Sequence, residues 1–228
     1  TPLPPTAGLG VSWVSAGVTD IQGRNSAGEK TTMMQTGEDA LMISFAQRIL
    51  PWFSFGANIK ILQNQLPINE SYKGSGNGFD IGFLFKSGNS TTFGLMIQDI
   101  NSMYNWDSGD LYAEGRIYSE YFPTIYRLGT KFLYKNILVV ADAGFITNYR
   151  VGKEISDDTF ISLLPRIGFE YTYLDLYYFR GGLGNGRIAF GWGLQYDLIK
   201  NHDSRIDYTF SMDWASQLSH TLSYGFNF

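Results

Sequence analysis

Apolar and polar residues alternate along most of this chain. In one typical stretch, the residues of one parity are all large and apolar, namely Ile188, Phe190, Trp192, Leu194 and Tyr196. The intervening residues are small or polar, namely Arg187, Ala189, Gly191, Gly193, Gln195 and Asp197. Because successive side chains of a β-strand point to opposite faces, this pattern predicts a strand with one apolar face and one small, polar face.

The same alternation predicts about twelve strands over the whole chain. We place them at residues 7–17, 39–49, 53–66, 77–87, 91–100, 123–133, 137–148, 159–174, 175–183, 186–198, 204–214 and 218–228. Short connections, such as 50–52, 88–90 and 134–136, tend to alternate with long ones, such as 18–38, 67–76, 101–122 and 149–158. Short turns at one end and long loops at the other are typical of outer-membrane β-barrels.

We therefore predict an all-β fold, with one antiparallel transmembrane β-barrel domain over residues 1–228. A soluble β-sandwich is the alternative, because its strands also alternate. The barrel is favoured because small residues line the polar face, as the crowded inside of a closed barrel requires. The apolar face is rich in aromatic residues, which form girdles at membrane interfaces. The last strand also ends on Phe228, which resembles the C-terminal signal of bacterial outer-membrane barrels.

Composition and charge exclude several other classes. The chain contains 26 Gly, which argues against a helical protein. A hydrophobic content of 44% with a net charge of −4 argues against disorder and against nucleic acid as a partner. No apolar run reaches the roughly 18 residues of a transmembrane helix. The first residues, Thr1 to Thr6, lack the basic start and apolar core of a signal peptide, so we expect a mature or truncated chain.

Many charged residues fall on the small, polar parity of the strands. They are Lys60, Asp80, Lys86, Arg127, Lys131, Asp142, Arg166, Glu170, Arg187, Asp197, Arg205, Asp207 and Asp213. Facing lipid at the bilayer midplane would cost about 2–4 kcal/mol for each Arg or Lys, so we predict that these side chains face the lumen. The expected hairpin registers place Arg127 opposite Asp142 and Asp197 opposite Arg205.

These charges are mixed in sign, whereas ion-selective pores favour rings of one sign. We therefore expect a narrow or plugged lumen whose strands are connected by salt bridges. We favour a structural role for the charges over a role in binding a substrate. The segments 74–78 and 181–186 are rich in glycine, but neither opens a helix after a parallel strand, so we interpret both as turns rather than phosphate-binding loops.

Nothing in the sequence indicates an enzyme, a metal site or a cofactor. The chain has no Cys and only two His, at positions 202 and 220. Ser219 is next to His220 in an expected strand, so the two side chains point to opposite faces and do not form a nucleophile–base pair. We expect a non-enzymatic protein without cofactors.

The connection 101–122 is expected to be a long extracellular loop, and it is rich in aromatic residues. They are Tyr104, Trp106, Tyr112, Tyr118, Tyr121 and Phe122. Loops of this length are usually functional, and exposed aromatic residues favour contact with a protein or capture of an apolar ligand. An ordered lid over the barrel mouth is the alternative.

A series of short segments, in order from about residue 39 to the C-terminus, resembles the PorV/PorQ family of FadL-like outer-membrane barrels. The segments are 53–60, 78–85, 92–99, 123–129, 166–170, 179–182, 206–210 and 219–228. The resemblance implies an integral protein of the bacterial outer membrane with about fourteen strands and an N-terminal plug. The plug motifs are not seen here, so we expect either a chain that lacks its first two strands and plug or a shorter relative.

The resemblance implies two kinds of function. PorV-like proteins are partners of the type IX secretion translocon and receive its exported proteins, whereas FadL-like proteins pass hydrophobic small molecules. The mixed charges and the aromatic loop favour the adaptor role, with transport as the alternative and a structural envelope anchor as a second alternative. The expected partners are outer-membrane lipids, lipopolysaccharide, the translocon and the barrel-assembly machinery. That machinery would read the C-terminal residues Tyr224, Phe226 and Phe228.

Overall fold

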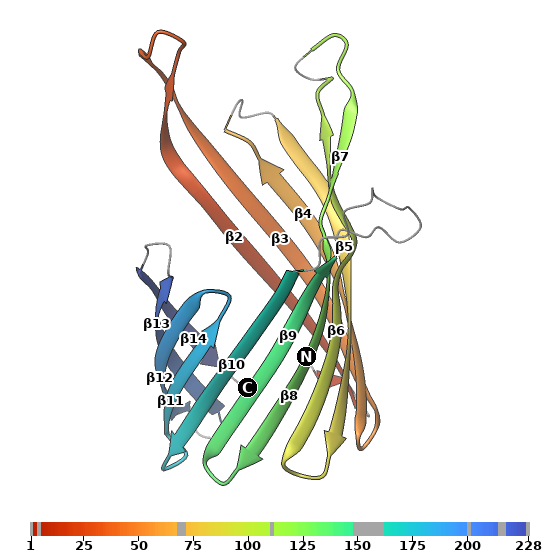
Figure 1. Cartoon of the computed structure of the whole chain (residues 1–228), viewed down its shortest axis with the longest axis vertical. Helices are drawn as coiled ribbons and strands as arrows, with labels where there is room; N and C mark the ends of the chain where they lie inside the picture. The colour runs from red at the N-terminus through yellow and green to blue at the C-terminus, as the bar shows by residue number, and fades with distance from the viewer. Residues whose placement is uncertain are drawn as a thin grey trace. The chain divides into compact units, whose positions relative to one another are not determined.

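The computed structural model describes residues 2–3, 6–67, 72–109, 112–147, 162–199, 202–213 and 218–226. These residues form strands and turns, and their strands are paired antiparallel within one sheet (Figure 1). Across the described ranges, no helix is long and apolar enough to cross a bilayer. The all-β, antiparallel class predicted from the alternation is confirmed.

The strands follow one another in chain order across the sheet, except that β7 pairs only with β6. Their bounds are β1 Pro2–Leu3, β2 Ala7–Arg24, β3 Lys30–Leu50, β4 Phe53–Gln65, β5 Lys73–Ser87, β6 Thr91–Asp107, β7 Ile117–Tyr121, β8 Thr124–Tyr134, β9 Ile137–Thr147, β10 Ser162–Tyr173, β11 Tyr177–Gly184, β12 Arg187–Ile199, β13 His202–Asp213 and β14 Leu218–Phe226. A strand lies in each of the ranges predicted from the alternation. The additional strands are β1 and β7.

Residues 18–38 were predicted to be a loop, and this prediction is wrong. Strands β2 and β3 continue through the segment and end at the pair Arg24 and Lys30. The turn between them is held by the Asn25 side chain, which accepts 3.0 Å hydrogen bonds from the backbone N–H groups of Ala27 and Glu29. Register shifts interrupt the ladder on both sides of Ile21. Each shift changes the parity of the following residues, so the alternation hides the strand.

Residues 101–122 are not a loop either, because β6 extends to Asp107 and β7 returns alongside it. Asp99 and Asn101 have the left-handed φ values of 58° and 50°. Beyond these two residues the buried positions Ser102, Tyr104 and Trp106 keep the parity of Gln98, but two of them are large and aromatic, so the alternation stops near residue 100 although the strand does not. The glycine-rich stretch 74–78 likewise lies within β5 and is not a turn. In the stretch 181–186, only Asn185 and Gly186 form the turn, both with positive φ.

The chain divides into two compact units. Unit 1 comprises Thr1–Phe83, Met96–Tyr126 and Ile146–Ile161, and unit 2 comprises Leu84–Leu95, Arg127–Phe145 and Ser162–Phe228. Unit 1 contains the long hairpin of β2 and β3, with β4 paired to β3. Unit 2 contains β10 to β14 in continuous antiparallel succession, drawn from cyan to blue in Figure 1.

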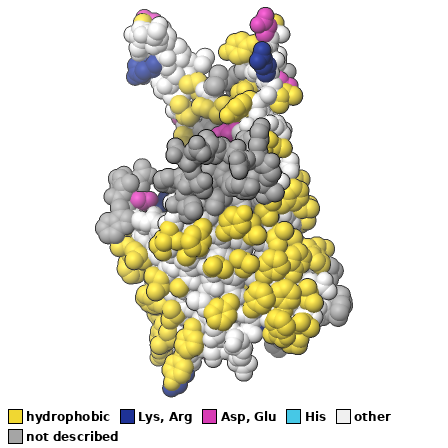
Figure 2. All heavy atoms as spheres, turned by 45° about the vertical axis from the view of Figure 1, so that its right-hand side comes forward, with side chains coloured by type: hydrophobic (Ala, Val, Ile, Leu, Met, Phe, Trp, Pro, Cys, Tyr) yellow, Lys and Arg dark blue, Asp and Glu magenta, His cyan; other side chains and the backbone are white. Residues whose placement is uncertain are grey.

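Burial is inverted relative to a water-soluble protein. In unit 2, Phe190 and Trp192 are 58% and 50% exposed. On the opposite face of the same sheet, Arg180 and Asp207 are half-buried and Gly193 is buried. The face drawn in Figure 2 is crowded with hydrophobic side chains, and few charged side chains lie among them. An apolar face of this extent is stable only against an apolar solvent or a partner, and membrane barrels present such a face to lipid.

Candidate functional site

The polar face of the sheet carries clusters of interacting side chains in both units. Unit 1 has an ionic group, which is centred on Lys60 in β4, and an apolar cluster. Lys60 Nζ lies 2.7 Å from Asp80 Oδ1 and 2.8 Å from Asp99 Oδ1. Asp80 is 3% exposed and also accepts hydrogen bonds from Asn58 Nδ2 at 3.1 Å and from the backbone N–H of Asp99 at 3.0 Å. The buried carboxylate is therefore well satisfied, and it holds the left-handed Asp99 in place.

An apolar cluster lies on the same face of unit 1, because Leu62 follows Lys60 by two positions in β4. Leu62, Tyr104 and Trp106 are 6%, 2% and 5% exposed, and within the described ranges they are the buried apolar core. Their half-buried neighbours are Ala40, Leu66, Tyr72 and Phe122. We call these seven residues the aromatic cluster. The rings interlock in packing arrangements that aromatic pairs prefer.

Ring geometry and polar contacts fix the orientation of the aromatic cluster. The Tyr104 and Phe122 rings are nearly perpendicular, with centroids 5.0 Å apart, and Tyr72 stacks on Trp106 at 5.7 Å. The Tyr104 hydroxyl donates to Glu38 Oε1 at 2.6 Å, and Trp106 Nε1 donates to Glu120 Oε2 at 3.0 Å. Buried Tyr and Trp side chains normally find such partners, which here lock both rings.

The glycines of β5 make room for this cluster. A Cβ on Gly74 would lie 2.7 Å from the Trp106 ring, and one on Gly78 would overlap the Ser102 side chain. Only glycine lets the side chains of β6 lie flat against β5. The glycines of the stretch 74–78 therefore leave the space that the side chains of β6 occupy.

The structure divides the aromatic residues predicted to form one exposed loop. Tyr104 and Trp106 are buried in β6, and Phe122 packs on Tyr104. Tyr112 and Tyr118 are 68% and 67% exposed, and Tyr121 is 39% exposed. The buried side chains project onto the polar face because β6 continues past residue 100, which the broken alternation concealed.

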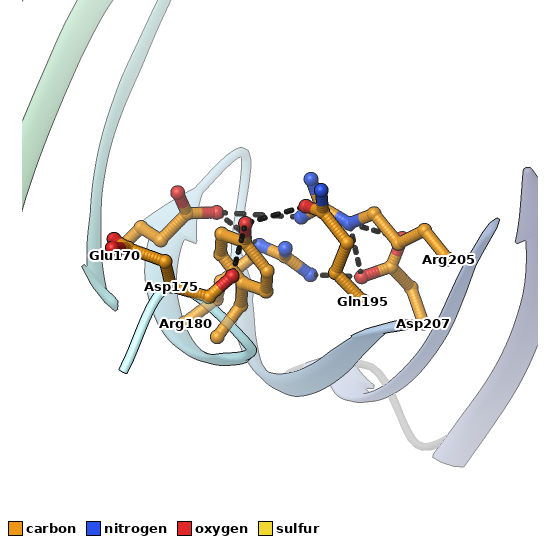
Figure 3. Close-up of polar contacts among 7 residues, drawn as sticks. Glu170, Asp175, Arg180, Gln195, Arg205 and Asp207 are labelled. Carbon is orange, nitrogen blue, oxygen red and sulfur yellow. Dashed lines mark hydrogen bonds and ion pairs between the residues drawn. The ribbon is translucent and has the colours of Figure 1, made fainter. Parts of the chain in front are cut away.

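The main cluster of unit 2 connects four strands. Arg180 in β11 donates through Nε to Glu170 Oε2 in β10 at 2.5 Å and through Nη1 to Asp207 Oδ1 in β13 at 2.6 Å (Figure 3). Arg205 closes the ring, with Nε 3.0 Å from Asp207 and Nη2 3.6 Å from Glu170. The Arg205 guanidinium lies 4.2 Å from the centre of the Tyr178 ring. We call Glu170, Tyr178, Arg180, Gln195, Arg205 and Asp207 the ionic network.

Glycine also makes the ionic network possible. Arg180 reaches across β12 to Asp207 because Gly191 pairs with Arg180 and Gly193 pairs with Asp207. A Cβ on Gly193 would overlap Asp207 Oδ1 and lie 3.2 Å from Arg180 Nη1. The Tyr178 hydroxyl donates to Gln195 Oε1 at 2.7 Å, which adds a contact from β12.

Other charges of the predicted set form smaller groups in unit 2. Asp142 Oδ1 lies 2.6 Å from Arg127 Nη1 and 3.0 Å from Arg166 Nε, and Arg187 Nε lies 2.9 Å from Asp213 Oδ2. Where the structure describes the side chains, Lys86 and Lys131 are exposed and take part in none of these ion pairs.

The predicted pair of Asp197 and Arg205 is wrong. Arg205 pairs with Gln195, and Asp197 pairs with Asp203 at the backbone level. The turn is tighter than expected, since β12 ends at Ile199 and β13 begins at His202, and a register shift lies between Asp197 and Ile199. The side chain of Asp197 lies outside the described residues.

Two central charges were not among the predicted set. Arg180 has the opposite parity to Tyr177 and Phe179, so the alternation in β11 contained the signal for it. Asp99 shares its parity with the apolar Leu95 and Ile97, and only the left-handed backbone turns its carboxylate toward Lys60. No sequence signal indicated that reversal.

The predicted C-terminal assembly signal lies in β14. Tyr224 and Phe226 are 58% and 38% exposed, and Phe228 lies outside the described residues. On the apolar face of the same strand, His220 Nδ1 lies 2.6 Å from the Tyr208 hydroxyl. Among the described residues, no group of three or more His, Cys, Asp or Glu could hold a metal ion.

Solved structures share this architecture. The toluene transporter TodX of Pseudomonas putida aligns over 97% of this chain and 78% of its own, with a TM-score of 0.60 and 15% identity. The monoaromatic hydrocarbon channel CymD aligns over 99% of this chain and 80% of its own, with a TM-score of 0.64 and 12% identity. A FadL homologue of Pseudomonas aeruginosa aligns over 92% and 68%, with a TM-score of 0.62 and 13% identity.

These likenesses show the fold. The chain shares the all-β antiparallel architecture of these channels, and the alternation of its residues predicts that fold class. No protein-family model matches the sequence. No curated protein matches it either.

Proposed function

We propose that this protein is an integral outer-membrane channel for small hydrophobic molecules. The aromatic cluster carries the proposal. Apolar side chains such as Leu62, Trp106 and Phe122 are unfavourable on a face that lines only a water-filled pore, because exposing them to water costs free energy. Binding sites for apolar molecules are lined by aromatic side chains with a few polar groups. Tyr104 and Trp106 are 2% and 5% exposed, so such a molecule would meet these rings only by displacing their neighbours in the cluster.

Two further observations support transport in the outer membrane. The inverted burial of unit 2 suits a lipid-facing surface, since Phe190 and Trp192 are half exposed while charged side chains are withdrawn. The solved structures with this fold include a toluene transporter and a monoaromatic hydrocarbon channel. A channel role therefore agrees with the fold and with the chemistry of the site, and it requires no enzymatic residue.

The adaptor role in type IX secretion has lost its main support. It depended on the mixed charges and on an exposed aromatic loop, but Tyr104 and Trp106 of that segment are buried and Phe122 packs on them within unit 1. Side chains that are 2% and 5% exposed do not contact a partner protein without a rearrangement. The transport function, first set out as the alternative, therefore becomes the main proposal.

The test compares uptake of radiolabelled toluene by cells that produce the protein or a variant. At equal amounts of folded protein in the outer membrane, we expect Tyr104→Phe to retain uptake and Trp106→Ala to lose most of it, because the indole ring supplies the largest apolar surface. Tyr118→Ala is the matched control, since Tyr118 lies in the same hairpin but is 67% exposed. Wild-type uptake equal to that of cells without the protein would refute the channel, provided that the protein is folded in the outer membrane.

A further inference from the structure

We propose that the ionic network of unit 2 is an ion barrier that makes the channel selective for neutral molecules. The inference rests on the proposed function in one respect, since it takes the polar face of β10–β13 to line the channel interior. The apolar face of the same strands is half exposed, as a lipid-facing surface is. Its opposite face therefore meets the contents of the channel.

Charge balance is the first argument. The network contains two arginines and two carboxylates, and each arginine contacts both carboxylates. No charge of either sign is in excess. Selective ion pores instead use rings of one sign, which replace the hydration shell and attract the permeating ion. A balanced network offers no such attraction to cations or anions.

Connectivity is the second argument. The network runs without a break from Glu170 in β10 to Arg205 and Asp207 in β13, and β12 contributes no side chain between Arg180 and Asp207. Figure 3 shows Arg180 lying between Glu170 and Asp207. An ion that bound to one of these charged groups would have to separate it from its partner of opposite charge. Each separation leaves a partly buried charge without its partner, which is costly.

Packing is the third argument. The side chains of Glu170, Arg180 and Asp207 are only 20% to 25% exposed. The Arg205 guanidinium is covered by the Tyr178 ring at 4.2 Å, and the Tyr178 hydroxyl is held by Gln195 at 2.7 Å. The aromatic ring and the amide thus keep the arginines packed.

The test measures ion conductance across planar lipid bilayers that contain the purified full chain in a KCl gradient. Wild-type protein is expected to show no steady conductance. Arg180→Gln leaves one arginine against two carboxylates and is expected to admit cations. Asp207→Asn leaves two arginines against one carboxylate and is expected to admit anions. Each variant should raise the conductance about tenfold or more, with reversal potentials of opposite sign.

Arg187→Gln is the matched control. It also removes one arginine from unit 2, but Arg187 is 66% exposed and pairs only with Asp213 among the described residues. This variant is expected to stay closed like the wild type. An equal conductance in Arg187→Gln and Arg180→Gln would overturn the proposal, because the loss of any arginine would then have the same effect.

Other outcomes also decide the question. A wild-type protein that conducts as strongly as the variants overturns the barrier, and so does the same ion preference in Arg180→Gln and Asp207→Asn. Folding is checked by the heat-dependent shift in gel mobility that outer-membrane barrels show. If Arg180→Gln does not fold, Arg205→Gln replaces it, since it leaves the same net charge in the network. Toluene uptake is measured separately. An absence of uptake by the wild type refutes the proposed transport, whereas the conductance of the variants tests the ion barrier.

Discussion

The side chains on the polar faces of the two units are packed by different means. In unit 1, Tyr104 and Trp106 are buried among other apolar side chains. In unit 2, Arg180 lies between Glu170 and Asp207, and no apolar side chain is buried there among the described residues. Both arrangements depend on glycine in a neighbouring strand. The chemical character of a glycine-rich strand face therefore depends on the side chains of neighbouring strands that lie over it.

The two means differ in their energetic consequences. Burying aromatic rings stabilises the fold roughly in proportion to the apolar area removed from water, and good ring geometry adds to it. Ion pairs recover little net free energy, because desolvation of the charges offsets most of their attraction. Substitutions in the aromatic cluster should therefore lower the free energy of unfolding most. Substitutions in the ionic network should instead change which solutes the channel admits.

The largest loss of stability is expected for Trp106→Ala. The substitution removes a side chain that is 5% exposed and leaves a cavity between Tyr72 and Tyr104. Such truncations cost about 3–5 kcal/mol. Guanidinium-induced unfolding in detergent micelles measures the change, with Tyr118→Ala as the exposed control in the same hairpin. A change below that of the control would show that the cluster does not hold unit 1 together.

Asp80→Asn tests the ionic part of unit 1. Asp80 is 3% exposed, and its removal leaves Lys60 with Asp99 as its anionic partner. Removing one partner of a buried pair costs about 3–5 kcal/mol, and the remaining contact to Asp99 should hold the loss near the lower bound. The same unfolding experiment measures it. A loss as small as that of an exposed pair would contradict the assigned role of Asp80 in holding β6.

Gly193→Ala tests the dependence of unit 2 on a bare backbone. The added Cβ would overlap Asp207 Oδ1, so the carboxylate must move away from Arg180. Forcing a side chain into such a packed position typically costs about 1–3 kcal/mol. Gly225→Ala is the control, because its Cβ would have only an ordinary contact at 4.0 Å. Equal unfolding midpoints for the two variants would show that the network tolerates a side chain in β12.

The smallest effect is expected for Arg187→Ala. Its side chain is 66% exposed, so the ion pair with Asp213 is screened by solvent. Exposed pairs contribute about 0–1 kcal/mol. A shift in the unfolding midpoint as large as that of Asp80→Asn would erase the distinction between the exposed and buried ion pairs.

Much of the fold could be predicted from the sequence, because strand parity is a local property. Each stretch predicted to be a strand contains one, and the charges placed on the polar parity include Lys60, Glu170 and Asp207, which do meet partners there. The predictions failed where the alternation breaks inside a strand. Left-handed residues at Asp20, Asp99 and Asn101 and the register shifts of β2 hid the continuation of strands into segments expected to be loops.

The candidate sites depended on contacts that parity does not contain. Tyr104 and Trp106 were recognised as important aromatic residues but were placed in an exposed loop, because nothing local shows that the glycines of β5 lie against the continuation of β6, with Gly74 under the Trp106 ring. Arg180, the centre of the ionic network, was not singled out. Its importance comes from reaching past β12 to a strand with which β11 does not pair.

The sequence by itself determined that this protein is made of antiparallel strands with one apolar and one polar face, since alternation sets the direction of every side chain relative to its neighbours. Only the tertiary structure decided which residues meet across strands. Register and bulges bring Asp99 to Lys60, and the bare backbone at Gly193 lets Arg180 reach Asp207. Those contacts depend on strand pairing and on empty space, and neither is a property of any single segment of the chain.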